Sequence, residues 1–162
     1  AHIESAAVLN EKFDVLRREH GIGEWPAIRL RALVLFWHDQ LHAAHGLVQE
    51  LGDGEGSWIH GMVHRREPDY WNAKYWFRRV GQPALFRTLG SRVLRVLAGQ
   101  ATRGWAERLT PGGVWDALVF VDWCQSLEKE EGEDAEVMLA RRIQQEEFEV
   151  WFEHLVRGGE VE

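Results

Sequence analysis

Apolar residues recur at helical spacing along most of the chain, and glycine or proline residues separate the periodic segments. Residues 3–20 mix apolar and charged positions as an amphipathic helix does, and Gly21 follows as a stop signal. The next helix opens at residues 24–26 and is expected to continue unbroken to about Leu51, where the glycine-rich run 52–56 ends it. The N-terminal third therefore predicts two helices, the second of them long.

Caps and helix breakers divide the rest of the chain. Pro68 disfavours helical backbone at Glu67, so a third helix that Ser57 caps must end there. Asp69 then caps a short fourth helix. Later helices are expected at residues 83–97, from Thr110-Pro111 into the apolar stretch 114–127, and at 134–156, with a connector at 99–113 and an acidic loop at 128–136.

The stretch 114–127 is apolar on nearly every side and could form a central strand, but the chain offers no second strand to pair with it. We read it as a buried helix. The pattern as a whole predicts an all-α fold, a compact bundle of about six to seven helices that forms one domain from residue 1 to residue 162.

Composition restricts the class of partner and the compartment. The chain of 162 residues has a formal charge of -7 at pH 7, without the overall basic footprint of nucleic-acid or anionic-membrane binders. No apolar run approaches the roughly 18 residues of a membrane span, and the N-terminal residues do not resemble a signal peptide. Cys124 is the single cysteine and lies in an apolar run, typical of an inert core thiol. We expect a cytoplasmic protein with no nucleic-acid or membrane partner.

Histidines form a stripe on the second predicted helix. A helix turns by about 100° per residue, so His42 lies roughly 40° around the helix axis from His38 in one direction. His45 lies roughly 20° from His38 in the opposite direction. His60 and His64 repeat this spacing on the third predicted helix. Antiparallel packing of the two helices would bring His45 level with His60 and His42 level with His64. The pattern therefore predicts an imidazole cluster of the kind that binds a divalent metal such as Zn, Fe, Mn or Ni.

Glu67 and Asp39 are the candidate catalytic carboxylates near these histidines, and each could serve as a metal ligand or as a general base. His38-Asp39 is similar to the His-Asp doublet of helical metal-dependent phosphohydrolases, for which Asp122 is a candidate further ligand. The opposing interpretation is that the histidines only form hydrogen bonds, that Asp39 pairs with an arginine and that Asp122 bonds within the bundle. The chain lacks an H-E-x-x-H motif and a pair of E-x-x-H motifs, which favours the second interpretation.

Arginine and aromatic side chains gather in residues 58–81. Guanidinium groups bind carboxylates and phosphates with paired donors and stack on aromatic rings, so this block can hold a small anionic ligand. The candidate ligand-binding residues are Arg65, Arg66, Trp71, Asn72, Tyr75 and Arg79. The alternative, which the closeness of the charges favours, is an internal network in which Glu67 and Asp69 neutralise the arginines.

The same region carries a resemblance to a known family. The matching residues are Trp37-His38-Asp39, His45, Trp58, His60, His64 to Tyr70 and Asn72 to Gly81. They resemble the signature of an uncharacterised, mostly bacterial protein family with no assigned function, over roughly residues 37–86. The family pattern has an acidic residue in place of His42 and a His-Pro pair near Gln82-Pro83. The resemblance therefore favours His38, His45, His60 and His64 as the site residues.

Three functional hypotheses follow. The first is a helical protein with a His/Arg/aromatic pocket that binds a divalent metal or a small anionic ligand, with metal-assisted hydrolysis as the reaction if it is an enzyme. The second is a non-enzymatic interaction or scaffold protein whose His/Arg/Glu network is structural. The third is a metal-free pocket that binds a small organic molecule against tryptophans. A homo-oligomer is compatible with each of them, and composition does not decide between enzyme and non-enzyme.

Overall fold

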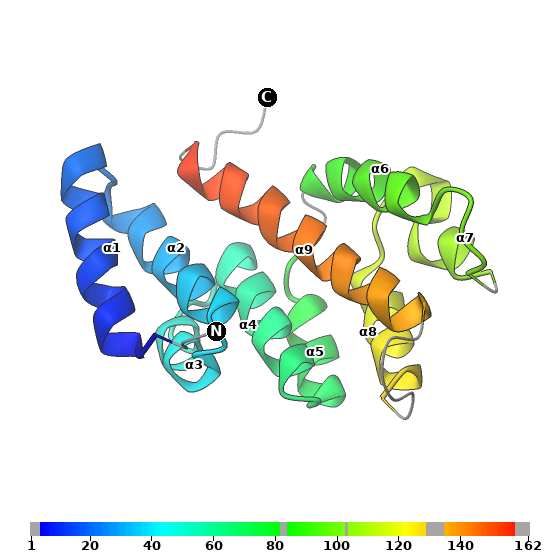
Figure 1. The fold of residues 1–162 in the computed structure, drawn as a ribbon, viewed down its shortest axis with the longest axis horizontal. Helices are drawn as coiled ribbons and strands as arrows, with labels where there is room; N and C mark the ends of the chain where they lie inside the picture. The colour runs from blue at the N-terminus through cyan, green and yellow to red at the C-terminus, as the bar shows by residue number, and fades with distance from the viewer. Residues whose placement is uncertain (1–3, 82–83, 103, 129–134, 158–162) are drawn as a thin grey trace.

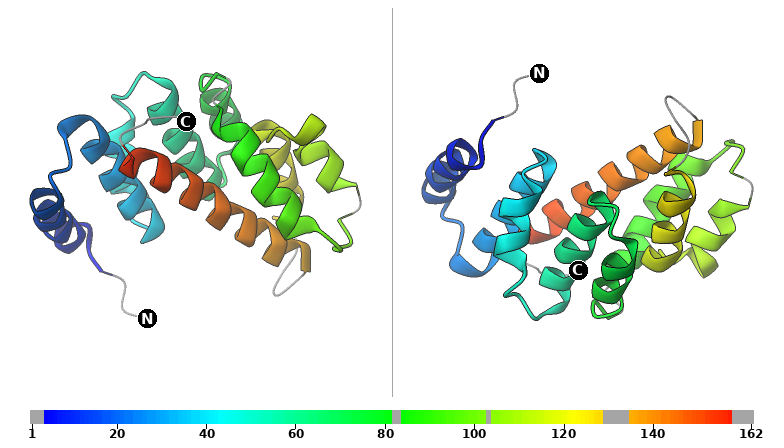
Figure 2. Two further views of the ribbon diagram at one scale, coloured as in Figure 1. Left: turned by 90° about the horizontal axis from the view of Figure 1, so that it is seen from above. Right: turned by 90° about the horizontal axis from the view of Figure 1, so that it is seen from below.

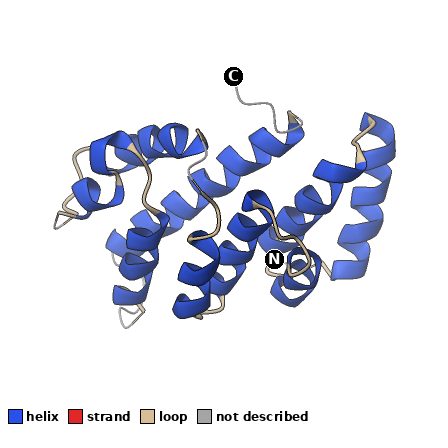
Figure 3. Cartoon of the chain, turned by 180° about the vertical axis from the view of Figure 1, so that it is seen from behind, coloured by secondary structure: helices blue, strands red, loops and turns tan. Residues whose placement is uncertain are grey.

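The computed structural model describes residues 4–81, 84–102, 104–128 and 135–157. Within these ranges the chain forms nine α-helices and one short 3-10 turn, and it contains no strand (Figure 3). The α-helices are α1 Ala6–His20, α2 Glu24–Trp37, α3 Leu41–Val48, α4 Gly54–Arg66, α5 Tyr70–Phe77, α6 Leu85–Leu97, α7 Trp105–Leu109, α8 Ala117–Ser126 and α9 Ala135–Val156; the 3-10 turn is η1 Pro111–Gly113. The all-α prediction is confirmed, whereas six to seven helices was too low a number.

The largest departure from the predicted elements is the break between α2 and α3, where a single long helix was expected. Asp39 adopts a left-handed backbone conformation with a φ of 57°. The Gln40 N–H donates to the Leu35 carbonyl at 2.8 Å, and the Asp39 N–H donates to the Phe36 carbonyl at 3.0 Å. This is the Schellman termination, with Asp where Gly is usual. Because Asp is among the few non-glycine residues that tolerate this conformation, no glycine or proline marks the break.

Two further boundaries differ from the sequence prediction. Asp53, not Ser57, caps α4, and its carboxylate accepts from the Gly56 N–H at 2.8 Å. Ser57 is fully buried inside that helix. The predicted connector 99–113 contains α7, and α8 begins only at Ala117, where the Asp116 carboxylate accepts from two backbone N–H groups. Pro83, Asp134 and most of the acidic loop lie outside the described residues.

Other local predictions are confirmed. The third predicted helix ends before Pro68, and Asp69 caps α5 by accepting from the Asn72 N–H at 3.3 Å. Gly21 terminates α1 in a left-handed conformation with a φ of 63°. The apolar stretch from residue 114 does form a buried helix, α8. For α1, α4 and α5 the signal is local, a cap or a breaker within a few residues of the helix end.

The helix α9 crosses the molecule and packs against α2, α6 and α8 (Figure 1). The helices α3, α4 and α5 pack one against the next beside α9. The helices α6, α7 and α8 lie together at the end of the molecule opposite α1 (Figure 2). Trp58, Trp115, Trp123 and Trp151 are at most 2% exposed and form much of the core. The α1 helix lies at the edge of the molecule, against α2 (Figure 1).

In the part of the chain that the structure describes, no helix has both the length and the apolar composition needed to cross a membrane.

Candidate functional site

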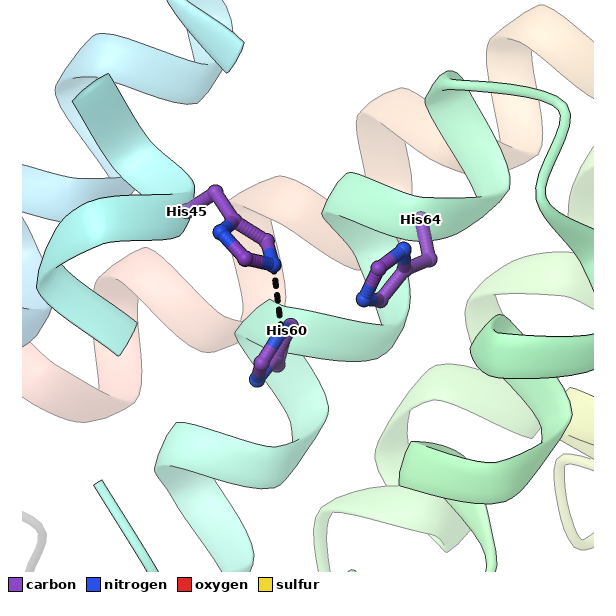
Figure 4. Close-up of side chains that lie close together, drawn as sticks. All are labelled: His45, His60 and His64. Carbon is purple, nitrogen blue, oxygen red and sulfur yellow. Dashed lines mark hydrogen bonds between the residues drawn. The ribbon is translucent and has the colours of Figure 1, made fainter. Parts of the chain in front are cut away.

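Three histidines from two neighbouring helices converge on one point. His45 lies in the last turn of α3, and His60 and His64 lie one turn apart on α4 (Figure 4). One ring nitrogen from each lies within 4.8 Å of the others. His45 Nε2 and His60 Nε2 are 2.9 Å apart and share a hydrogen bond. The spacing of four residues along α4 stacks His60 on His64, while packing of α3 against α4 brings His45 edge-on to both rings.

The cluster is partly enclosed. His60 is only 3% exposed and stacks on the Trp76 ring of α5, with 3.9 Å between the ring centroids. His64 Nδ1 lies 3.5 Å from Asp69 Oδ2 and 3.7 Å from Glu67 Oε2. Buried polar groups are nearly always hydrogen-bonded. The Nδ1 atoms of His60 and His64 are buried and have no hydrogen-bond partner in the described structure.

Burial and mutual repulsion keep these rings uncharged. Burial, as the largest cause, and the charges that His45 and His64 would carry together lower the pKa of His60 from 6.5 to about 4. Burial also lowers the pKa of His64, against the opposing effect of the Asp69 and Glu67 carboxylates. Both rings are therefore neutral at pH 7. A neutral imidazole offers the lone pair that a metal ion requires.

His38 and His42 do not join the cluster, so the predicted stripe of histidines is wrong at these two positions. Both side chains are exposed. The left-handed Asp39 redirects the chain between them, and the helical phase that aligned His38 with His42 and His45 is lost. His38 instead contributes to a separate hollow between α1 and α2.

The two predicted catalytic acids are placed differently. Glu67 lies at the cluster, near His64. Asp39 faces Arg66, with Asp39 Oδ1 2.6 Å from Arg66 Nη2, which is the arginine pairing considered as its alternative role. Asp122, the candidate further ligand, pairs with Lys74 of α5 rather than with a histidine. The predicted His38-Asp39 metal doublet is therefore not assembled.

Arg65 is neutralised, but by another acid than the sequence suggested. Arg65 is buried and forms a bidentate ion pair with Glu147 of α9, which lies 82 residues away along the sequence. Burial alone would lower the pKa of Arg65, and the Glu147 carboxylate more than offsets this effect and raises it. Glu67 and Asp69, the expected partners, face His64 instead.

The remaining candidate ligand-binding residues lie on α5 or just after it. Trp71 is 75% exposed and stacks on Tyr75, and the Arg79 guanidinium lies over Tyr75 and over Trp76 at 5.6 Å and 5.3 Å from the ring centroids. Asn72 does not face a ligand space: its amide donates to Asp69 Oδ2 at 2.6 Å. It therefore positions the carboxylate that faces His64.

Sequence reasoning missed two residues that contact the cluster, Trp76 and Asp69. The contact of Trp76 with His60 depends on how α4 meets α5. Asp69 was read as a helix cap and arginine partner, and it is the nearer of the two carboxylates to His64 Nδ1. The position of Asp69 just after the His64-bearing helix was the available signal.

A scan against protein-family models found no match, and searches of the curated proteins and of the solved structures found none either. The resemblance of residues 37–86 to an uncharacterised family stays a prediction.

Proposed function

We propose that this protein binds a divalent transition-metal ion through His45, His60 and His64. The observation that supports the proposal most is the convergence of three ring nitrogens within 4.8 Å on two packed helices. Two nitrogens bound to one tetrahedral zinc are separated by about 3.3 Å, given Zn–N bonds of roughly 2.0–2.1 Å. The His45 and His60 Nε2 atoms are 2.9 Å apart and all three ligand atoms lie within 4.8 Å of one another, which is close to the spacing that such an ion needs.

The donor set also suggests the kind of ion and the kind of site. Imidazole suits Zn, Fe and Ni, and a nearby carboxylate extends the range to Mn. A set of three histidines leaves a coordination position open for water or substrate, as in catalytic rather than structural zinc sites. Asp69 and Glu67 lie where a carboxylate would orient His64 and raise its basicity, and Asn72 holds Asp69 in place.

Metal-assisted hydrolysis is the reaction class that we assign to such a site. The ion would supply an activated water, which is the chemistry that bound zinc contributes at neutral pH. Glu67 would accept the proton, and Arg79, just after the adjacent α5, would hold an anionic substrate group. In this proposal the protein acts in the cytoplasm, which a chain with one cysteine supports.

The alternative is a non-enzymatic interaction or scaffold protein with a purely structural polar network. The observation that favours it is the extent of internal pairing: Arg65 with Glu147, Arg66 with Asp39, and His154 with Glu55 at 2.7 Å. His45 and His60 likewise bond to each other. In that case the cluster would bind no metal, and the rings would only fix the packing of α3 on α4.

Elemental analysis of untagged protein, purified without chelators and without a nickel column, tests the proposal. We expect close to one Zn, Fe, Mn or Ni per chain. In chelator-stripped protein, zinc at a hundred times its Kd should stabilise the fold by about 2.7 kcal/mol. That corresponds to a rise in Tm of about 5–10 °C for a chain of this size. Protein that contains no metal and whose Tm does not respond to added metal would support the structural network instead.

Matched histidine variants locate the site. His60→Ala combined with His64→Ala should abolish metal binding, and His45→Ala should weaken it, while the far-UV helical signal stays largely intact. His42→Ala is the control, because His42 is exposed on the same helix as His45 and does not reach the cluster. Loss of metal in the control, or full metal content in the double variant, contradicts the assignment.

A further inference from the structure

A second candidate site lies apart from the histidine cluster. A cleft of about 570 Å³ opens where the ends of α2 and α4 face the middle of α9. His45, His60 and His64 do not line it. Its walls combine three aromatic rings, two guanidinium groups and two amides: Phe36, Trp37, Phe148, Arg66, Arg141, Gln144 and Gln145.

The aromatic side of the cleft is an exposed ring pair. Trp37 is 51% exposed and leans on Phe148, with 4.6 Å between the ring centroids and 37° between the ring planes. The contact with Phe148 restrains the indole while leaving about half of its surface in water. A planar ligand ring gains stacking and apolar burial on such a surface.

Arg141 supplies a cation without an acidic neighbour on its own helix. Its neighbours three and four residues away are Val137, Met138, Gln144 and Gln145. Its hydrogen bond within the described structure is a long one to Met138 Sδ, at 3.9 Å. The adjacent Arg142 differs, because it bonds to Glu146 Oε1 at 2.7 Å. On a helix rich in glutamate, Arg141 therefore keeps its donors available to a ligand.

Arg66 adds a second cation at the same place. One of its nitrogens holds Asp39, and its side chain stays 46% exposed. A guanidinium group carries five N–H donors, so the contact with Asp39 leaves donors for another acceptor. A neighbouring hollow of about 270 Å³ also has Arg66, Arg141 and Gln144 in its wall, which makes both cations accessible from two sides.

We propose that this cleft binds a small planar aromatic acid, with its ring against Trp37 and Phe148 and its carboxylate or phosphate group at Arg141 and Arg66. The volume falls in the range of roughly 300–1,000 Å³ typical of small-molecule sites. Paired guanidinium donors match the planar carboxylate and the phosphate group better than a neutral head group. The Gln144 side chain also lines the cleft and offers an amide to further polar atoms of the ligand.

Calorimetric titration of chelator-stripped protein with four probes tests the chemistry. The probes are 2-naphthoate, 2-naphthyl phosphate, the neutral 2-naphthamide and the non-aromatic cyclohexanecarboxylate. We expect saturable binding of at least one naphthyl acid, and the tighter of the two identifies the head group as carboxylate or phosphate. The amide and the cyclohexane acid should each bind at least about tenfold more weakly. An amide that binds as tightly as the acids overturns the proposal, and so does the absence of saturable binding by both acids.

Arg141→Gln should weaken binding of the preferred acid at least about tenfold, because it removes a charge-assisted contact. Arg142→Gln is the matched control: it makes the same charge change one position along the helix, and we expect its Kd to stay within about twofold of the unchanged protein. Trp37→Leu should also weaken binding about tenfold while Tm changes little, because the ring is half exposed. Equal affinities of the Arg141→Gln and Arg142→Gln variants contradict the assignment. Because metal is removed throughout, these outcomes do not depend on the histidine site.

Discussion

The buried ion pair between Arg65 and Glu147 offers the sharpest test of how α4 is held. The two side chains keep only 2% and 0% of their surface exposed, and the Arg65 guanidinium also lies over the Phe120 ring at 4.7 Å from the centroid. Arg65→Met keeps a side chain of similar length but leaves the Glu147 carboxylate without its partner. Breaking such a pair costs about 3–5 kcal/mol, a large share of the roughly 5–15 kcal/mol that stabilises a typical domain.

The cost of Arg65→Met should depend on pH in a defined direction. Burial raises the pKa of Glu147 and Arg65 opposes this, so the variant raises that pKa further. A carboxyl group whose pKa is raised in the folded state takes up its proton there at a higher pH than in the unfolded chain. The penalty is therefore larger at pH 8 than at pH 5, because protonation removes the buried charge as the pH falls.

Urea unfolding followed by far-UV circular dichroism at pH 8 and pH 5 measures these effects. The double variant Arg65→Met with Glu147→Leu should recover to within about 1 kcal/mol of the original protein or exceed it, since no charge remains buried. Arg66→Met is the control on the next residue: its pair with Asp39 is exposed and should contribute at most about 1 kcal/mol. A loss below about 1 kcal/mol for Arg65→Met at pH 8, or a double variant no more stable than the single one, would refute this reasoning.

Three further predictions follow from single contacts. Metal-free protein should lose up to about 3 kcal/mol of unfolding free energy as the pH falls from 6.5 to 4, because His60 takes up its proton at a higher pH in the unfolded chain than in the folded one. A flat profile of unfolding free energy in urea titrations across this range would contradict the lowered pKa of about 4. Gly90→Ala should lower the free energy of unfolding by about 1–3 kcal/mol, because the added Cβ would lie 2.4 Å from the Gly113 carbonyl oxygen. Gly46→Ala should raise it by about 0.5–1 kcal/mol, because Gly46 lies on an exposed helix face with open space around it. Equal Tm values for the two variants would count against this packing. Burial raises the pKa of the Cys124 thiol to about 11, so iodoacetamide at pH 8 should label folded protein far more slowly than urea-unfolded protein; mass spectrometry showing equal rates would exclude this protection.

The candidate site divides into a part that the sequence predicts and a part that it does not. His60 and His64 share a helix face because they are four residues apart, and this holds wherever the helix lies. The placement of His45 required α3 to pack beside α4, which the short connection between the two helices made a reasonable expectation. The prediction that His38 and His42 join the cluster is wrong because one left-handed residue, Asp39, changes the helical phase. An Asp at that position carries no strong stop signal in the sequence.

Ion-pair partners were the least predictable feature. Glu67 and Asp69 were natural partners for Arg65 by proximity in sequence, yet the buried partner is Glu147, on a helix near the other end of the chain. Nothing in the local pattern of α9 distinguishes Glu147 from its neighbouring glutamates. The same holds for the cleft, where Trp37 and Arg141 meet only because α9 packs across α2.

The sequence by itself determined the all-helical class, the C-terminal ends of α1 and α4, the start of α5, and the alignment of His60 with His64. These depend on helical periodicity, on caps such as Asp69 and on breakers such as Pro68, and these interactions act within a few residues. Tertiary structure alone decided the break at Asp39, the pairing of Arg65 with Glu147 and the cleft beside Trp37. These depend on which helix faces meet, and that outcome follows from burial of the whole apolar surface, in which contacts between distant residues outweigh local preference.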